Sequence, residues 1–220
     1  MEIITKVINT VYSFVVSRWQ YFVAGGVVVV LVFIGVLVYF SIQSAEENSL
    51  KTKFDLAYFS YINSQKDTNT LEQNFQNFLS TLQSISDTGK NYKIVAIANI
   101  ILGDIYYNQG RSFDTAISYY SKATNAPSQF LRVVAIFNIA QTYEAMGLFE
   151  EALKNYEVIF KNYPNSFLAP VSIVKSSEVF YYIGNFDKAR EMYSLATNKY
   201  PDSYANTIND LLGLVINQVK

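Results

Sequence analysis

The sequence contains no cysteine and no histidine. Their absence excludes disulfide bonds, thiol nucleophiles and imidazole bases, together with the side chains that most often bind zinc and haem iron. It leaves the redox compartment open, because a chain without cysteine suits either side of a membrane. We therefore expect neither a metal site nor a cofactor.

Positive charge is not in excess either. Lysine and arginine number 17 against 18 aspartate and glutamate residues, which gives a formal net charge of −1. Proteins that bind nucleic acid normally carry a basic patch that neutralises phosphates. The composition therefore predicts no nucleic-acid partner.

The motifs of common active sites are also missing. There is no glycine-rich phosphate loop, since Gly25 and Gly26 lie within an apolar run. No nucleophile motif stands at a strand-to-helix turn, and no strands are predicted. The acidic pair Glu150 and Glu151 lies at a predicted helix start, where it favours the helix dipole. We expect no enzyme, and a hydrolytic carboxylate pair within a helical stack is the remaining catalytic alternative.

Residues 21–42 form a run without any charge. In a helix this run extends about 33 Å, close to the thickness of a bilayer core. Aromatic residues stand at both ends, as at membrane interfaces, and no polar stripe interrupts the run. A cleaved signal peptide is the alternative, but its apolar region is usually shorter and no good cleavage site follows. An uncleaved transmembrane anchor is therefore predicted.

The charges that flank this run predict its orientation. Lys6 and Arg18 precede it against Glu2, and acidic residues slightly outnumber lysines just after it. The positive-inside rule then places the N-terminus in the cytoplasm and residues 43–220 outside an inner (cytoplasmic) membrane. Residues 1–20 form the cytoplasmic segment, and their apolar residues recur at helical spacing. This pattern favours an amphipathic helix on the inner leaflet over a flank without a role of its own.

A repeated phrase marks the rest of the chain. Gly110, Gly147 and Gly184 stand 37 positions apart. Each is preceded by a small residue and followed by an aromatic residue, an alanine and a tyrosine. The small residues are Gly103, Ala140 and Ser177, and the tyrosines are Tyr120, Tyr156 and Tyr193. A fixed period with fixed chemistry predicts stacked helical hairpins, in which the glycine ends the first helix in a left-handed conformation.

The pattern predicts the following helices and domains. Three pairs are expected, at 94–109 with 113–125, 129–146 with 149–162, and 167–183 with 186–199. A weaker hairpin at 46–62 with 71–86 precedes them, and a terminal helix at 204–219 covers the open end of the stack. The domains are then a cytoplasmic segment (1–20), a transmembrane helix (21–42), a degenerate helical hairpin (43–90) and a repeat domain with a capping helix (91–220).

These phrases resemble the tetratricopeptide repeat over about residues 96–202. The resemblance implies an all-α chain, with one transmembrane helix followed by an α-solenoid of helical hairpins. The first repeat departs from the pattern by an insertion at Arg111 and Ser112, and the third carries Ser176 where an apolar residue is usual. The motif is specific for the fold, whereas proteins with this fold bind many different partners.

The layout of the whole chain resembles the membrane-anchored tetratricopeptide proteins that are ancillary subunits of the Sec translocon. That resemblance implies a periplasmic repeat domain that contacts the translocon and chaperones. Anchored bacterial proteins of this kind are also structural subunits of large envelope assemblies such as flagellar collars, and this is the alternative function.

The first helix of each pair is expected to line a concave groove that binds a protein segment. The inward-facing residues are Ile100, Asp104, Tyr107 and Asn108, then Phe137, Gln141 and Glu144, and then Val174, Glu178, Tyr181 and Tyr182. Aromatic rings with three carboxylates suit an extended peptide or an amphipathic helix of basic character. The alternative is a solvated face whose aromatic residues are covered by the 46–86 hairpin. Capture of a C-terminal carboxylate is not expected, because Ile100, Asp104 and Asn138 stand where such clamps carry lysine, asparagine and arginine.

These observations predict a membrane-anchored, extracytoplasmic scaffold for interactions with other envelope proteins. The chain contacts the lipid bilayer through one span. Gly25, Gly26 and Gly35 lack the spacing that drives transmembrane helix dimers, and the oligomeric state stays open.

Overall fold

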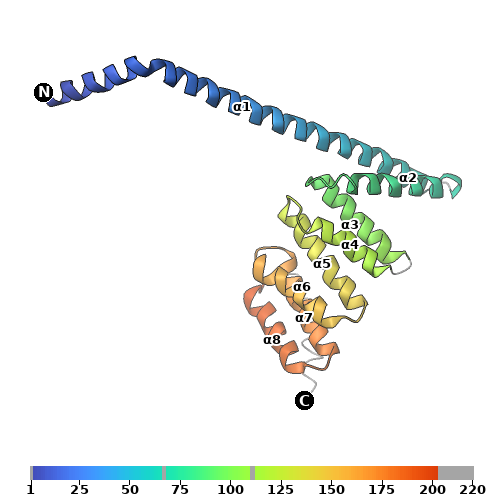
Figure 1. Cartoon of the computed structure of the whole chain (residues 1–220). Helices are drawn as coiled ribbons and strands as arrows, with labels where there is room; N and C mark the ends of the chain where they lie inside the picture. The colour runs from blue at the N-terminus through green and yellow to red at the C-terminus, as the bar shows by residue number, and fades with distance from the viewer. Residues whose placement is uncertain (1, 66–67, 110–111, 203–220) are drawn as a thin grey trace. The chain divides into compact units, whose positions relative to one another are not determined.

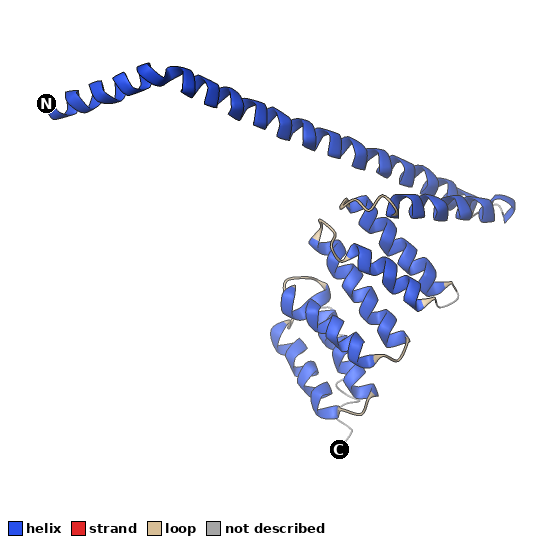
Figure 2. Ribbon diagram, in the orientation of Figure 1, coloured by secondary structure: helices blue, strands red, loops and turns tan. Residues whose placement is uncertain are grey.

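The computed structural model describes residues 2–65, 68–109 and 112–202. Within these ranges the regular elements are eight α-helices, and no strand is present (Figure 2). The prediction of an all-α chain is confirmed. The chain divides into two compact units, Met1–Ser49 and Leu50–Lys220, which are described in turn.

Helix α1 runs from Glu2 to Ser64 without interruption (Figure 1). The sequence predicted an amphipathic helix within 1–20 that runs into a span at 21–42, and a further helix at 46–62. The structure joins them because no proline, the strongest helix breaker, occurs before Pro127.

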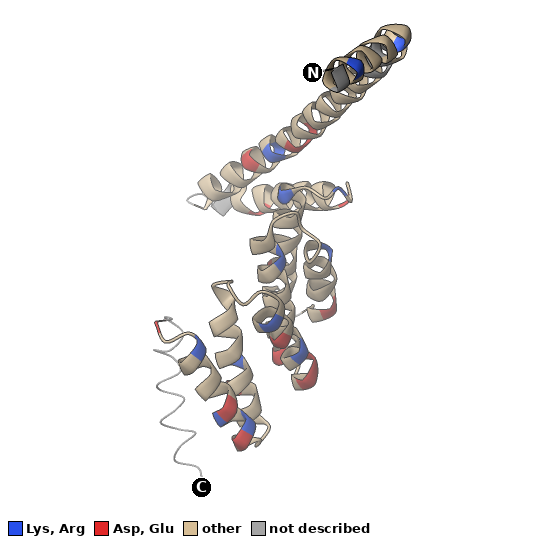
Figure 3. Cartoon of the chain, turned by 90° about the vertical axis from the view of Figure 1, so that its left-hand side faces the viewer, with Lys and Arg blue, Asp and Glu red and all other residues tan. Residues whose placement is uncertain are grey.

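The first unit is the part of α1 up to Ser49, and it contains the apolar run. Side chains of residues 28–42 are all exposed, and Figure 3 shows a stretch of α1 without charged residues. In the part of the chain that the structure describes, this is the one helix long and apolar enough to cross a membrane, and its apolar window is unburied. A core helix of a soluble domain would bury such a stretch, so the exposure fits a helix whose solvent is lipid.

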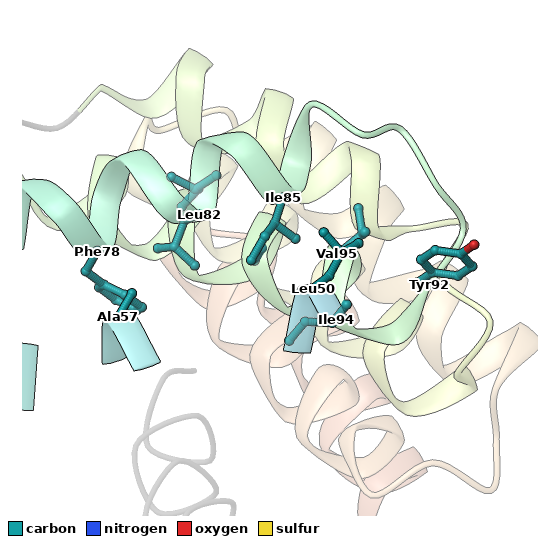
Figure 4. Packing of buried hydrophobic residues seen from close by; sticks show 10 residues of the cluster. Leu50, Ala57, Phe78, Leu82, Ile85, Tyr92, Ile94 and Val95 are labelled. Carbon is teal, nitrogen blue, oxygen red and sulfur yellow. The ribbon is translucent and has the colours of Figure 1, made fainter. Parts of the chain in front are cut away.

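The second unit begins with the last turns of α1 and with α2 (Thr68–Ser86). Buried side chains from both join residues of the next helix in one core cluster, shown in Figure 4, which includes Leu50, Ala57, Phe78, Leu82, Ile85 and Val95. Tyr61 stacks on Phe78, with their ring centroids 5.6 Å apart. The hairpin expected before the repeats is therefore present, and it packs on the N-terminal end of the stack.

Three helix pairs follow, as predicted. They are α3 (Lys93–Asn108) with α4 (Phe113–Ala123), α5 (Gln129–Ala145) with α6 (Phe149–Asn162), and α7 (Leu168–Tyr182) with α8 (Phe186–Lys199). Helix α3 contacts α5, and α5 contacts α7, whereas α4, α6 and α8 do not contact one another within the described ranges. The first helices, α3, α5 and α7, thus form a continuous inner layer. The second helices, α4, α6 and α8, lie further apart on the outer side. A stack built this way is a solenoid with its first helices on the concave side.

Left-handed glycines end the first helices of the second and third pairs. Gly147 has φ 74° and Gly184 has φ 78°. The Leu148 N–H donates to the Tyr143 carbonyl at 2.9 Å, and Asn185 donates to Phe180 in the same way. These bonds satisfy carbonyls at the helix ends, and they confirm the predicted role of the two glycines. The predicted equivalent Gly110 and the predicted capping helix at 204–219 lie outside the described residues.

The small residue of the repeat allows the paired helices to approach closely. In the first pair, a Cβ atom placed on Gly103 would lie 2.3 Å from Cε1 of Tyr120. Tyr120 and its equivalent Tyr156 are both buried, as are the alanines four residues before them. The spacing of small residue and tyrosine therefore fixes how each second helix packs on its first helix.

Candidate protein-binding face

Burial separates the predicted groove residues into two groups. Ile100 and Val174 are buried in core clusters, so they support the surface from below and do not form it. Their burial follows from the position of the first helices, which pack against a second helix and against the next pair. The others form what we call the concave face: Asp104, Tyr107, Phe137, Gln141, Glu144, Glu178 and Tyr181 are half-buried, and Asn108 and Tyr182 are exposed.

Asp104 lies where the first pair meets the second. Its Oδ1 accepts a hydrogen bond from the Tyr120 hydroxyl at 2.7 Å and another from Asn138 Nδ2 at 3.1 Å. Burial raises the pKa of the Asp104 carboxyl above its usual value, and the Tyr120 hydrogen bond opposes part of that shift. The carboxylate thereby joins α3, α4 and α5.

In the second pair the position of Asp104 holds Gln141, and a carboxylate three residues later, Glu144, accepts the hydrogen bond from the repeat tyrosine. Its Oε2 accepts a hydrogen bond from the Tyr156 hydroxyl at 2.7 Å. Burial, followed by the charge of Glu144, raises the pKa of Tyr156, so this phenol stays a donor at all ordinary pH values. The ring of Phe137 packs against that of Tyr156 at 5.6 Å and holds the tyrosine in place.

Glu178 supplies the third carboxylate, and Lys175 balances it. Lys175 Nζ donates to Glu178 Oε2 at 2.6 Å, and both side chains are largely shielded from solvent. Burial acts to lower the pKa of Lys175, but the hydrogen bond that it donates to Glu178 and the charges of Glu178 and Glu144 raise it overall. Lys175 therefore stays charged beside the two glutamates.

Aromatic rings flank the carboxylates in two repeats. Tyr107 packs on Phe113 at 5.4 Å, and the equivalent Tyr181 packs on Phe186 at 5.5 Å. Tyr182, next to Tyr181, is 69% exposed. The core cluster that the end of α1 and α2 share with α3 includes Tyr106, the neighbour of Tyr107. Tyr106 does not belong to the concave face.

The sequence placed these carboxylates and rings on one surface, but it missed how they are held. The repeat pattern identifies Tyr120 and Tyr156, but it does not show that their hydroxyls donate hydrogen bonds to Asp104 and Glu144. The sequence indicates Asn138 only as a departure from a carboxylate clamp, and it assigns Lys175 no role on this face. A signal existed for Lys175, because it stands three residues before Glu178 on a helix, where opposite charges meet.

The arrangement suits recognition more than chemistry. Each carboxylate uses one oxygen internally, while Asp104 Oδ2, Glu144 Oε1 and Glu178 Oε1 make no hydrogen bond within the described residues. No group of three potential metal ligands occurs in the part of the chain searched, which is the described part. Three surface hollows of about 390, 560 and 460 Å³ lie elsewhere, and none includes a residue of the concave face. The face is therefore a fixed, open, acidic surface.

Comparison with known proteins agrees with this geometry. A family model of the tetratricopeptide repeat matches residues 134–166 and 172–203, which correspond to the second and third helix pairs. Stacked repeats of this kind provide extended surfaces that bind other proteins. No curated protein matches the chain.

Proposed function

We propose that the chain is a membrane-anchored scaffold that holds a segment of another protein along the concave face. The supporting observation is the set of three carboxylates, Asp104, Glu144 and Glu178, each held by a hydrogen bond to one oxygen. Groups fixed before binding lose little further conformational entropy when a partner arrives. Stability alone does not require three half-buried carboxylates on one surface, because buried charge is costly to maintain.

The partner is a segment of basic character that also carries apolar side chains. Lys175 is the one cation in the described network, and it is already paired with Glu178. Lysine or arginine side chains of the partner would bind the open carboxylate oxygens, and Tyr107, Tyr181 and Tyr182 would contact its apolar residues. Tyrosine is enriched among the residues that contribute most to protein–protein binding.

The scaffold acts at the inner membrane, with its N-terminus in the cytoplasm and its repeats on the extracytoplasmic or periplasmic side. The exposed apolar stretch of α1 supports the anchor, and the flanking charges support the orientation. The partners would then be other envelope proteins, among them the translocon or periplasmic chaperones, and the chain would not itself be an enzyme.

Affinity purification of the full chain from membranes in mild detergent tests this proposal. The wild type is compared with a Glu144→Gln, Glu178→Gln variant, which keeps the shape of both side chains and removes two negative charges. We expect translocon or chaperone subunits to co-purify with the wild type and to be reduced at least tenfold with the variant. Equal recovery with both proteins would reject the acidic face as the binding surface. Recovery of only a flagellar or other envelope assembly would reject the translocon partner and support the structural role.

A further inference from the structure

The first helix pair differs from the other two at a buried position of its first helix. Asn99 of α3 stands 37 residues before Ile136, and Ile136 stands 37 before Ile173. Both isoleucines are buried, and so is Asn99, with 2% of its surface exposed. The second and third pairs therefore bury an isoleucine at this position, and the first pair buries an asparagine.

A second equivalent position changes with it. Lys122 of α4 lies two residues after the repeat tyrosine, where the later pairs carry Val158 and Leu195. In the third pair, Leu195 packs with Ile173 in one apolar cluster. In the first pair the equivalent residues, Asn99 and Lys122, are both polar. Ser86 forms a hydrogen bond with each of them. Two coordinated departures from a repeat pattern are expected at functional places more than at random ones.

Two hydrogen bonds connect Asn99, Ser86 and Lys122. The Ser86 hydroxyl donates to Asn99 Oδ1 at 2.7 Å, and Lys122 Nζ donates to Ser86 Oγ at 3.3 Å. The Asn99 carbonyl is thereby satisfied, whereas Asn99 Nδ2 has no acceptor among the residues that the structure describes. A buried amide donor normally has an acceptor, and one without it calls for a ligand.

This amide lines a hollow of about 560 Å³ between the loop that follows α2, helix α3 and the end of α4. The hollow is lined by Ser86, Asp87, Gly89, Lys90, Asn91, Val95, Asn99, Lys122 and Asn125. Two lysines and one aspartate give this lining one net positive charge. The groups best placed to meet a ligand, Asn99 Nδ2 and Lys122 Nζ, are both donors.

We propose that this hollow binds a carboxylate group, with Asn99 and Lys122 donating to its oxygens. One negative charge matches the single positive charge of the lining, and a planar acceptor matches the amide donors around it. The carboxylate belongs either to a small free acid or to an acidic side chain of a bound protein. This site is separate from the concave face, whose carboxylates select the opposite charge.

Repeat-equivalent variants test the proposal without endangering the fold. Asn99→Ile and Lys122→Val introduce the residues that the second pair already carries, and Lys154→Met is a control lysine on α6, far from the hollow in sequence. Each full chain is placed in lipid nanodiscs, and its folding is checked by thermal unfolding. Isothermal titration calorimetry then measures binding of glutarate, of a blocked peptide with one internal glutamate, and of inorganic phosphate.

We expect saturable binding of a carboxylate probe by the wild type and by Lys154→Met. Affinity should fall at least tenfold in Asn99→Ile and in Lys122→Val, although both variants unfold at or above the wild-type temperature. Tighter binding of glutarate would identify the ligand as a small free acid. Tighter binding of the peptide would identify it as an acidic side chain of a protein. Equal affinity in all variants, preference for phosphate, or no binding of either carboxylate probe would overturn the proposal and leave Ser86–Asn99 as a link between helices.

Discussion

In the second and third helix pairs, the equivalent position of the first helix holds a buried isoleucine, Ile136 or Ile173, within an apolar cluster. In the first pair the same position holds Asn99, bound to Ser86. The helices of all three pairs nevertheless have similar lengths and pack in the same order. The comparison shows that the repeat fold depends on helix spacing and a few small residues, while single interior positions can change in chemistry.

The largest expected effect comes from transferring the polar residue into the second pair. Ile136→Asn would place an amide in an apolar cluster with Val133, Ile159 and Leu168. The substitution would also remove the apolar side chain that this cluster contains. We expect a loss of about 3 kcal/mol in the free energy of unfolding. Urea unfolding of the full chain in detergent, followed by circular dichroism, measures it. The reverse change, Asn99→Ile, should cost nothing or stabilise; equal losses in both variants would contradict the comparison.

A somewhat smaller effect is expected where the first pair carries glycine and the second alanine. Gly103→Ala places a methyl group 2.3 Å from the ring of Tyr120. This tyrosine is buried, and its hydroxyl donates a hydrogen bond to Asp104. Overpacking of this kind costs about 1–3 kcal/mol. The midpoint of the same urea transition reports the change. The double variant with Tyr120→Leu should recover part of the loss, and no recovery would place the strain elsewhere.

Turn glycines should behave alike in the second and third pairs. A Cβ atom at Gly147 or Gly184 meets nothing within 4 Å, so only the left-handed backbone opposes alanine. Each substitution should destabilise by about 1 kcal/mol. Gly35→Ala in α1, where neither a contact nor a positive φ is present, serves as the control. A difference of more than twofold between the two turns would show that their surroundings are not equivalent.

The smallest effect concerns the charge at the concave face. Asp104 has a raised pKa in the folded chain, so its protonated form favours folding. That contribution is fully present below the usual value of 3.8 and is lost as pH rises through the raised pKa. Asp104→Asn, which imitates the neutral Gln141 of the second pair, should remove this part of the pH dependence. Unfolding midpoints measured across that range for both proteins test it, and parallel curves would argue against a raised pKa.

Most of the fold could be predicted because its rules are local. Glycine and alanine at fixed positions, with tyrosine four residues after the alanine, defined every helix pair, and the observed helix ends lie within a few residues of those expected. The three segments predicted before residue 64 were joined into one helix, because a change from apolar to polar composition alters the environment of a helix without ending it.

The site was less predictable than the fold. Helical spacing indicated that Asp104, Glu144 and Glu178 share a surface, but it could not show that Ile100 and Val174 lie beneath that surface. Nor could it show that Tyr120 and Asn138 both donate to Asp104, because helical spacing predicts neighbours within one helix, and these contacts join three successive helices. The polar replacement at Asn99 was visible in the repeat alignment, and only its burial beside Ser86 and Lys122 gave it a meaning.

Site-specific photocrosslinking in intact cells tests most directly whether the concave face holds a protein. A photoreactive residue replaces Tyr107 or Tyr181 on the concave face, or Val158 on the outer helix α6, where the side chain is 37% exposed. The account predicts a shared, discrete crosslinked partner at Tyr107 and Tyr181 that is absent at Val158. The same products at all three positions, or crosslinks at Val158 alone, would contradict it.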